Sequence, residues 1–145
     1  MARGRVVVEV EVRPTESLEK VLAAVRSVLD IEEYRLEEAG PSRVLVATAS
    51  LRGLARLHRL LREQRILDAA RSVLRRGRSG GRIVFYLHKQ AATVGKISFV
   101  GGDQESPMGA IRVTIEHPDP DRVIDWLAPP TAMGRPLWEH EPPWE

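Results

Sequence analysis

The spacing of hydrophobic residues changes several times along this chain, and the order of these changes restricts the folds available to it. From Val6 to Val12, valine alternates with charged residues, which is typical of a strand with one buried face. From Leu18 to Leu29, apolar residues recur at helical spacing, and Thr15 is the predicted cap of this helix. The same patterns predict strands at Tyr34–Ala39, Arg43–Thr48, Ile83–Leu87, Lys96–Val100 and Ala110–Glu116, and helices at Leu51–Arg62, at Arg65–Arg76 and after Asp119.

The predicted elements follow one another as strand, helix, two strands, two helices, three strands and a closing helix. Hairpin connections are therefore as frequent as helical ones, which favours an α+β fold with a mostly antiparallel sheet and helices on one face. A length of 145 residues suits one domain, to which we assign residues 1–130. Residues 131–145 form a tail rich in proline and tryptophan, expected to be extended and either loosely ordered or laid across the domain.

Positive charge is concentrated in residues 52–89, which carry eleven cationic and two acidic side chains, a net charge of +9. The other residues carry −7, so the total of +2 conceals the asymmetry. Arginine suits phosphate because its planar group donates two parallel hydrogen bonds, and such a surface typically meets a polyanion. The alternative is a solvated helix face. The cations are Arg52, Arg56, Arg59, Arg62, Arg65, Arg71, Arg75, Arg76, Arg78, Arg82 and Lys89.

The predicted strand at Phe85 places a second group of candidate residues beside these cations. In an extended chain Tyr86, His88 and Gln90 share one face, while Phe85 and Leu87 point into the core. An aromatic ring beside cations can stack on an unpaired base. The competing interpretation is an ordinary, half-buried strand residue at Tyr86.

Other chemistry has little support in the sequence. Gly95-Lys96 lacks the earlier glycine and the following Ser or Thr of a phosphate-binding loop, so Lys96 is interpreted as a further surface cation. The four histidines show no metal-ligand spacing and there is no cysteine. We therefore predict no metal, no cofactor and no catalytic residue; Asp103 and Glu105 in a glycine-rich loop are the only basis for a metal-dependent nuclease.

The composition also bears on location and assembly. No apolar run of about 18 residues occurs, so no membrane is predicted as a partner. The absence of cysteine is typical of a reducing cytoplasm, and the absence of asparagine is typical of thermophiles. A strand starting at Ile111 is expected at an edge of the sheet, where it could pair with a second copy of the chain, so a homodimer is one alternative.

Four stretches of this chain resemble the archaeal family catalogued as UPF0201 or DUF54, whose members are described as predicted RNA-binding proteins or predicted exosome subunits. The resemblance implies a fold similar to that of the ribosomal protein that binds 5S RNA, and it implies no catalytic residues. The stretches are Glu63–Arg71, Phe85–Lys96, Ser106–Gly109 and Ile124–Pro129.

We therefore predict a non-catalytic, cytoplasmic RNA-binding protein connected with RNA processing. The first alternative is an adaptor that docks on an RNA-processing complex, with Trp138 and Trp144 as aromatic anchors; the second is the nuclease. The predicted RNA-binding residues are Arg52, Arg56, Arg59, Arg62, Arg71, Arg75, Arg76, Arg78, Arg82, Tyr86, His88, Lys89, Gln90 and Lys96.

Overall fold

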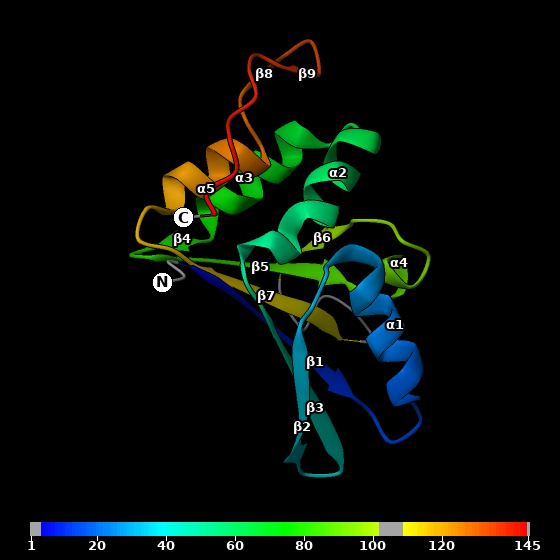
Figure 1. The fold of residues 1–145 in the computed structure, drawn as a ribbon. Coiled ribbons are helices and arrows are strands. Elements are labelled where there is room, and N and C mark those ends of the chain that lie inside the picture. Colours follow the sequence, from blue (N-terminus) through cyan, green and yellow to red (C-terminus); the bar gives the residue numbers. More distant parts are fainter. Residues whose placement is uncertain (1–3, 102–108, 145) are drawn as a thin grey trace.

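The computed structural model describes residues 4–101 and 109–144. These residues form one antiparallel sheet with a layer of helices, followed by a short hairpin and an extended tail (Figure 1). In chain order the elements are β1 (Arg5–Val12), α1 (Leu18–Val28), β2 (Glu33–Ala39), β3 (Ser42–Ala49), the 3-10 turn η1 (Leu51–Leu54), α2 (Ala55–Glu63), α3 (Leu67–Arg76), β4 (Arg78–Ser79), β5 (Arg82–His88), α4 (Lys89–Thr93), β6 (Phe99–Val100), β7 (Ala110–Glu116), α5 (Pro120–Leu127), β8 (Thr131–Ala132) and β9 (Arg135–Pro136).

The first strand of the chain lies in the interior of the sheet. The strand order is β2-β3-β1-β7-β5-β4, and β6 also pairs with β5. Neighbouring strands are antiparallel throughout. The helices pack on one face of this sheet (Figure 1). The predicted α+β fold is therefore confirmed.

The strand predicted to lie at an edge, which starts near Ile111, is β7. It pairs with β1 on one side and with β5 on the other. The prediction that two copies pair through this strand is therefore wrong. The long edge of the sheet is β2, which carries Glu33, Glu37 and Glu38. Acidic side chains along an exposed edge discourage the addition of another strand.

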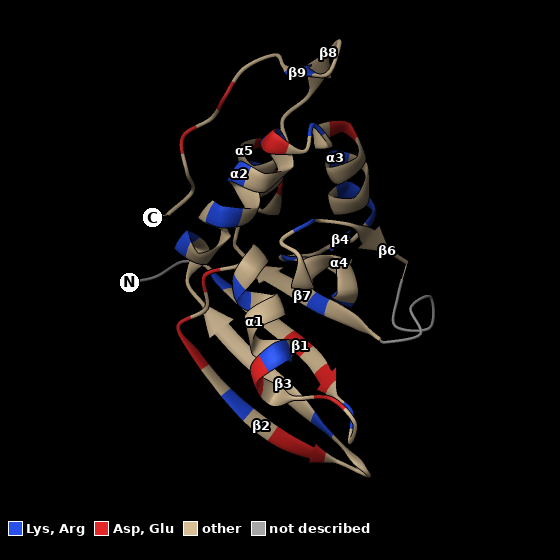
Figure 2. Ribbon diagram, turned by 90° about the vertical axis from the view of Figure 1, so that its right-hand side faces the viewer, with Lys and Arg blue, Asp and Glu red and all other residues tan. Residues whose placement is uncertain are grey.

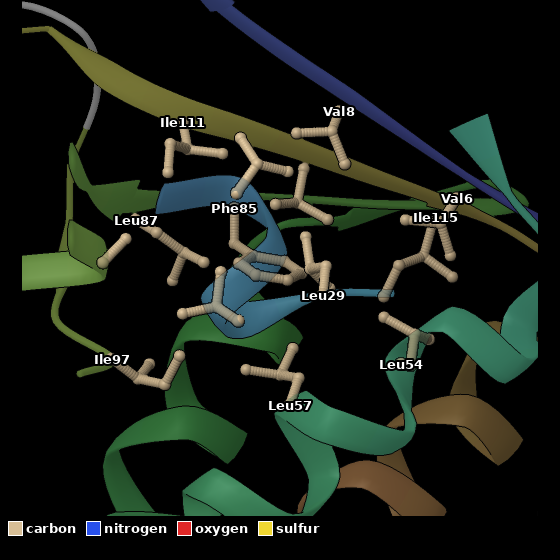
Figure 3. Close-up of a cluster of buried hydrophobic side chains, with 14 of the residues drawn as sticks. Val6, Val8, Leu29, Leu54, Leu57, Phe85, Leu87, Ile97, Ile111 and Ile115 are labelled. Atoms are coloured by element: carbon tan, nitrogen blue, oxygen red, sulfur yellow. The ribbon is translucent and has the colours of Figure 1, made fainter. Parts of the chain in front are cut away.

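The core lies between the sheet and the helices. Val8 is paired with Ala47 of β3 and Val113 of β7, so alternate residues of three strands share one buried surface. Leu57 of α2 and Phe85 of β5 pack into the same cluster (Figure 3). Each such side chain contributes roughly 1.5–3 kcal/mol of hydrophobic stabilisation. This core fixes the positions of the helices that carry the cationic residues.

Helix boundaries differ from the predicted ones where the chain turns. Ser17, and not Thr15, caps α1, because its side chain accepts a hydrogen bond from the backbone N–H of Lys20. The segment predicted as a helix from Leu51 begins with the 3-10 turn η1. Arg65 adopts a positive φ of 58°, so α3 begins after it and the chain bends between α2 and α3.

The segment 78–100 contains two elements that were not predicted from the sequence. Arg78 begins a tight hairpin in which β4 pairs with the start of β5. The short helix α4 follows β5 directly. Of the strand predicted at Lys96–Val100, only β6 forms. Residues 102–108, which include Asp103 and Glu105 of the glycine-rich loop, lie outside the described residues.

The C-terminal tail is laid across the helices. After the β8–β9 hairpin, which Leu137 closes by donating its backbone N–H to Pro130 O at 2.9 Å, the chain runs back along α5 (Figure 1). Trp144 packs on Trp126 of α5, with ring centroids 5.1 Å apart. Of the two arrangements considered for this tail, the described residues adopt the docked one.

Candidate nucleic-acid interface

Three arginines of η1 and α2 already have partners within the protein. Arg56 donates two hydrogen bonds to Asp30 Oδ1, at 3.1 and 3.2 Å. Arg59 pairs with Glu63 one turn later, at 3.3 Å. The Arg52 guanidinium lies over the ring of Trp144, 5.3 Å from its centroid. The cationic face predicted for this helix is therefore partly neutralised in the folded protein.

Arg62 is the most extensively bonded of these arginines. It forms a two-pronged ion pair with Glu139 of the tail, at 2.7 and 2.9 Å. Its side chain also donates to three backbone carbonyls, and only 20% of that side chain is exposed. A phosphate would have to displace all four partners, so we correct the prediction for Arg62 and assign it to fastening α2 to α5 and the tail.

Two further predicted contacts are paired with acids of α5. Arg71 donates to Asp125 Oδ1 at 2.9 Å and to Ala128 O at 3.1 Å. Arg78 binds both carboxylate oxygens of Asp121, at 2.6 and 2.7 Å. Asp125 and Asp121 lie 54 and 43 positions after their partners, so a count of charges within residues 52–89 does not include them.

Four cations keep an open environment. Among residues 4–101 and 109–144, none of the four forms an ion pair, and all are exposed. Arg76 donates a hydrogen bond to Ser72 Oγ, at 3.1 Å. We call this set the α3-side cations: Arg65, Arg75, Arg76 and Lys96.

Three of the α3-side cations, Arg65, Arg76 and Lys96, lie at the segment 96–100. The Gln64 side chain exchanges two hydrogen bonds with the backbone of Ile97, at 2.7 and 3.0 Å, and so places Lys96 beside the corner at Arg65. At its other end the segment becomes β6, which lines a groove together with Arg76. Figure 2 shows basic residues on α3 and around β4, next to β6, whereas acidic residues mark β2. Arg82 is also exposed, but it lies opposite Glu116 in the β5–β7 ladder.

The predicted row of Tyr86, His88 and Gln90 is only partly formed. Tyr86 is half-buried on β5, as predicted for a strand residue. His88 ends that strand, and its Nδ1 accepts the backbone N–H of Ala91 at 3.2 Å, so it caps α4. Because α4 begins at the next residue, Gln90 lies on a helix and not on the strand face. The row as predicted is therefore wrong beyond His88.

Lys89 is an interior residue, and its prediction as an RNA contact is wrong. Its side chain is 5% exposed, and its Nζ lies 3.0 Å from both carboxylate oxygens of Glu16 and 2.7 Å from Glu11 O. Glu16 also accepts the backbone N–H of Arg13 at 2.9 Å. The pair ties the end of β1 and the start of α1 to α4.

An aromatic stack beneath the tail was missed in the sequence. His58 of α2 stacks on Trp126 at a centroid distance of 4.7 Å, and Trp144 meets the same indole edge to face. Trp126 is 4% exposed. Burial and the neighbouring Arg62 lower the pKa of His58 from 6.5 to about 4, although Glu139 partly opposes this.

This stack predicts a dependence of stability on pH. The folded state depresses the pKa of His58, so between pH 6.5 and about 4 the unfolded chain binds a proton that the folded protein does not. The free energy of unfolding should therefore fall as pH decreases through this window. Urea denaturation of the wild type and of His58→Phe, which keeps a stacking ring, measures this: the variant should lose less stability between pH 7 and 5. Parallel pH profiles would contradict the assignment.

The described residues contain no group of three or more His, Asp or Glu side chains able to hold a metal ion. Asp103 and Glu105, the basis for the nuclease alternative, lie outside the described residues. No helix in the described part of the chain is long and apolar enough to cross a membrane.

Comparison with known proteins identifies the family. A family profile described as RNA binding matches residues 5–117, which is most of the chain. The chain belongs to this family. Membership supports RNA as the binding partner and gives no reaction.

Relatives and solved structures agree with this assignment. The chain is 56% identical to a UPF0201 protein of Aeropyrum pernix over 144 residues, which covers 98% of this chain and 96% of that protein. It is 52% identical to a UPF0201 protein of Sulfurisphaera tokodaii, covering 96% and 97%. The crystal structure of the UPF0201 protein from Methanococcus jannaschii superposes with a TM-score of 0.78 at 31% identity, covering 92% of this chain and 98% of that one. The family resemblance drawn from the sequence is therefore confirmed.

Proposed function

We propose that this protein binds RNA without catalysing a reaction, by contacting phosphates with the α3-side cations. The observation that carries this proposal is the position of Arg65, Arg76 and Lys96 at one segment, residues 96–100, with no ion-pair partner among the described residues. Arg75 is exposed on the same helix as Arg76 and likewise forms no ion pair in the described part of the chain. Exposed guanidinium groups that lack an acidic partner have donors available for phosphate oxygens. Membership of an RNA-binding family supports RNA as the polyanion.

Contacts of this kind hold the RNA backbone and carry little sequence information. Each phosphate that a cation neutralises releases counterions, so binding weakens as salt concentration rises. The protein should therefore bind many RNA sequences with similar affinity at low salt.

Fluorescence anisotropy with labelled single-stranded RNA, structured RNA and duplex DNA, each titrated at several salt concentrations, tests the proposal. The logarithm of the association constant should fall linearly with the logarithm of salt concentration. For single strands we expect a slope of about −0.7 for each phosphate contact, hence roughly −3 for four contacts. Absence of RNA binding at low salt would overturn the proposal.

The β8–β9 hairpin favours a second function, that of an adaptor within an RNA-processing complex. Met133 is fully exposed at the turn, and Leu137 and Trp138 are each about half exposed. Met133 has a φ of 53°, a conformation in which glycine or asparagine is usual and other residues cost about 1 kcal/mol. A turn that presents methionine at this cost suits an apolar pocket on a protein partner.

A lysate treated with nuclease distinguishes this second function. A partner captured by the wild type after RNA removal, and lost with a Met133→Asn, Trp138→Ala variant, would support the adaptor. A partner that is lost on nuclease treatment alone would be held through RNA, and this outcome would support RNA binding and not the adaptor.

A further inference from the structure

A groove of about 430 Å³ lies between the last turn of α3 and strands β5 and β6. Its wall includes Val73 and Arg76 from α3, Tyr86 from β5, and Phe99 from β6. The volume lies within the range of about 300–1,000 Å³ that is typical of sites for small organic groups. The groove opens beside the α3-side cation Arg76, so a nucleic acid held there would pass its mouth.

Aromatic residues occur along this groove. The chain has two phenylalanines and two tyrosines, and three of these four residues, Phe85, Tyr86 and Phe99, line it. Phe99 pairs with Leu87 and lies on the same face of the sheet as Phe85, whose buried ring it meets edge to face with ring centroids 6.0 Å apart. Phe99 is half-buried, so part of its ring remains accessible from the groove, whereas the Tyr86 side chain lies on the opposite face of β5.

The sheet itself creates the opening. β4 pairs with the first two residues of β5, and β6 pairs with Tyr86 and Leu87. Val84 and Phe85 therefore lie at a part of the β5 edge that neither short strand covers. The end of α3 approaches there, and Val84 N–H donates to Gly77 O at 3.0 Å. A Cβ on Gly77 would lie 2.0 Å from Val84 O, so only glycine permits this approach.

We infer that this groove receives one unpaired base of the bound RNA. The inference rests on the proposed RNA-binding function and adds the class of RNA. An aromatic, apolar wall accepts the face of any base, and the planar guanidinium of Arg76 at the rim can stack on the base or bind its phosphate. A base inside a duplex has both faces stacked and cannot enter. The ligand is therefore single-stranded RNA, or structured RNA with an unpaired nucleotide.

The test compares a single-stranded RNA with a duplex RNA of the same length, using Phe99→Leu, which removes the ring but keeps an apolar strand residue. Affinity for the single strand should fall about tenfold, because loss of one base–aromatic stack has this magnitude. Affinity for the duplex and the salt slope should not change. Tyr34→Leu is the matched control, since Tyr34 lies on β2, is 45% exposed and is the one Phe or Tyr outside the groove; it should change neither affinity.

Wild-type protein provides a second readout that does not depend on a variant. A single-stranded RNA containing one 2-aminopurine should lose fluorescence when its base stacks in the groove, and Phe99→Tyr should retain the loss. Equal losses of affinity for single strand and duplex, no loss of affinity in Phe99→Leu, or unchanged 2-aminopurine fluorescence would each overturn the inference. In each of these cases the proposed function, salt-dependent RNA binding, would still hold. Absence of RNA binding by the wild type would overturn the proposed function as well.

Discussion

Replacing Arg75, Arg76 and Lys96 by glutamate should lower the affinity for single-stranded RNA on the order of 100-fold at low salt. These residues are exposed and form no ion pair in the described part of the chain. Their loss therefore removes phosphate contacts without leaving a buried acid unpaired. The salt slope should become shallower by about 2, which anisotropy titrations measure directly.

A matched control separates local contacts from net charge. Lys20→Glu, Arg26→Glu, Arg43→Glu makes the same change in net charge on α1 and β3, away from α3. This variant should keep most of the salt slope. Equal weakening by both triple variants would mean that the protein attracts RNA through its total charge, and that the α3-side cations hold no special position.

Replacing Lys89 by methionine should reduce the free energy of unfolding by about 3–5 kcal/mol. The substitution leaves the Glu16 carboxylate, 11% exposed, without its cation, and leaves Glu11 O without its donor. A buried charge without a partner costs more than the intact pair contributes. Urea denaturation at pH 7 measures the loss.

Adding Glu16→Gln should restore part of this stability, because a neutral amide replaces the unpaired carboxylate and still accepts the Arg13 N–H. The salt slope of RNA binding should be the same in Lys89→Met as in the wild type. A variant that keeps its stability but binds RNA with a shallower slope would show instead that Lys89 contacts phosphate.

Most of the fold follows from local sequence patterns. The alternation at Val6–Val12 and the boundaries of Ala110–Glu116 match β1 and β7 closely, because strand residues alternate between a buried and an open face. What local patterns do not contain is the order of strands. The position of β7 between β1 and β5 depends on packing of distant segments, so its edges were misjudged.

The candidate site was harder to predict than the fold. Charge counted along the chain gives eleven cations in one segment, but the fold brings Asp30, Asp121, Asp125 and Glu139 to four of them. Long-range pairs of this kind have no signature in sequence spacing. Lys89 was misassigned for a related reason, since its partner Glu16 lies 73 positions earlier.

One signal of the docked tail was available. Val123, Ile124 and Leu127 already supply a complete buried side for α5, so Trp126 on the same short helix requires another cover. A second large apolar residue near the end of the chain, Trp144, provides it. A large aromatic residue on a helix that already has a complete buried side indicates that a further segment, here the C-terminal tail, packs on that helix.

The interior position of β1 has a consequence for synthesis of the chain. β1 leaves the ribosome first, yet its two ladder partners are separated widely: Val6 pairs with Ala49 on one side and with Ile115 on the other. The three-stranded unit β2-β3-β1 can form early through local contacts, whereas the second edge of β1 stays unpaired until β7 has been made. During that interval the nascent protein presents an apolar strand edge, and we expect closure of the sheet by β7 to be a late, non-local step in folding.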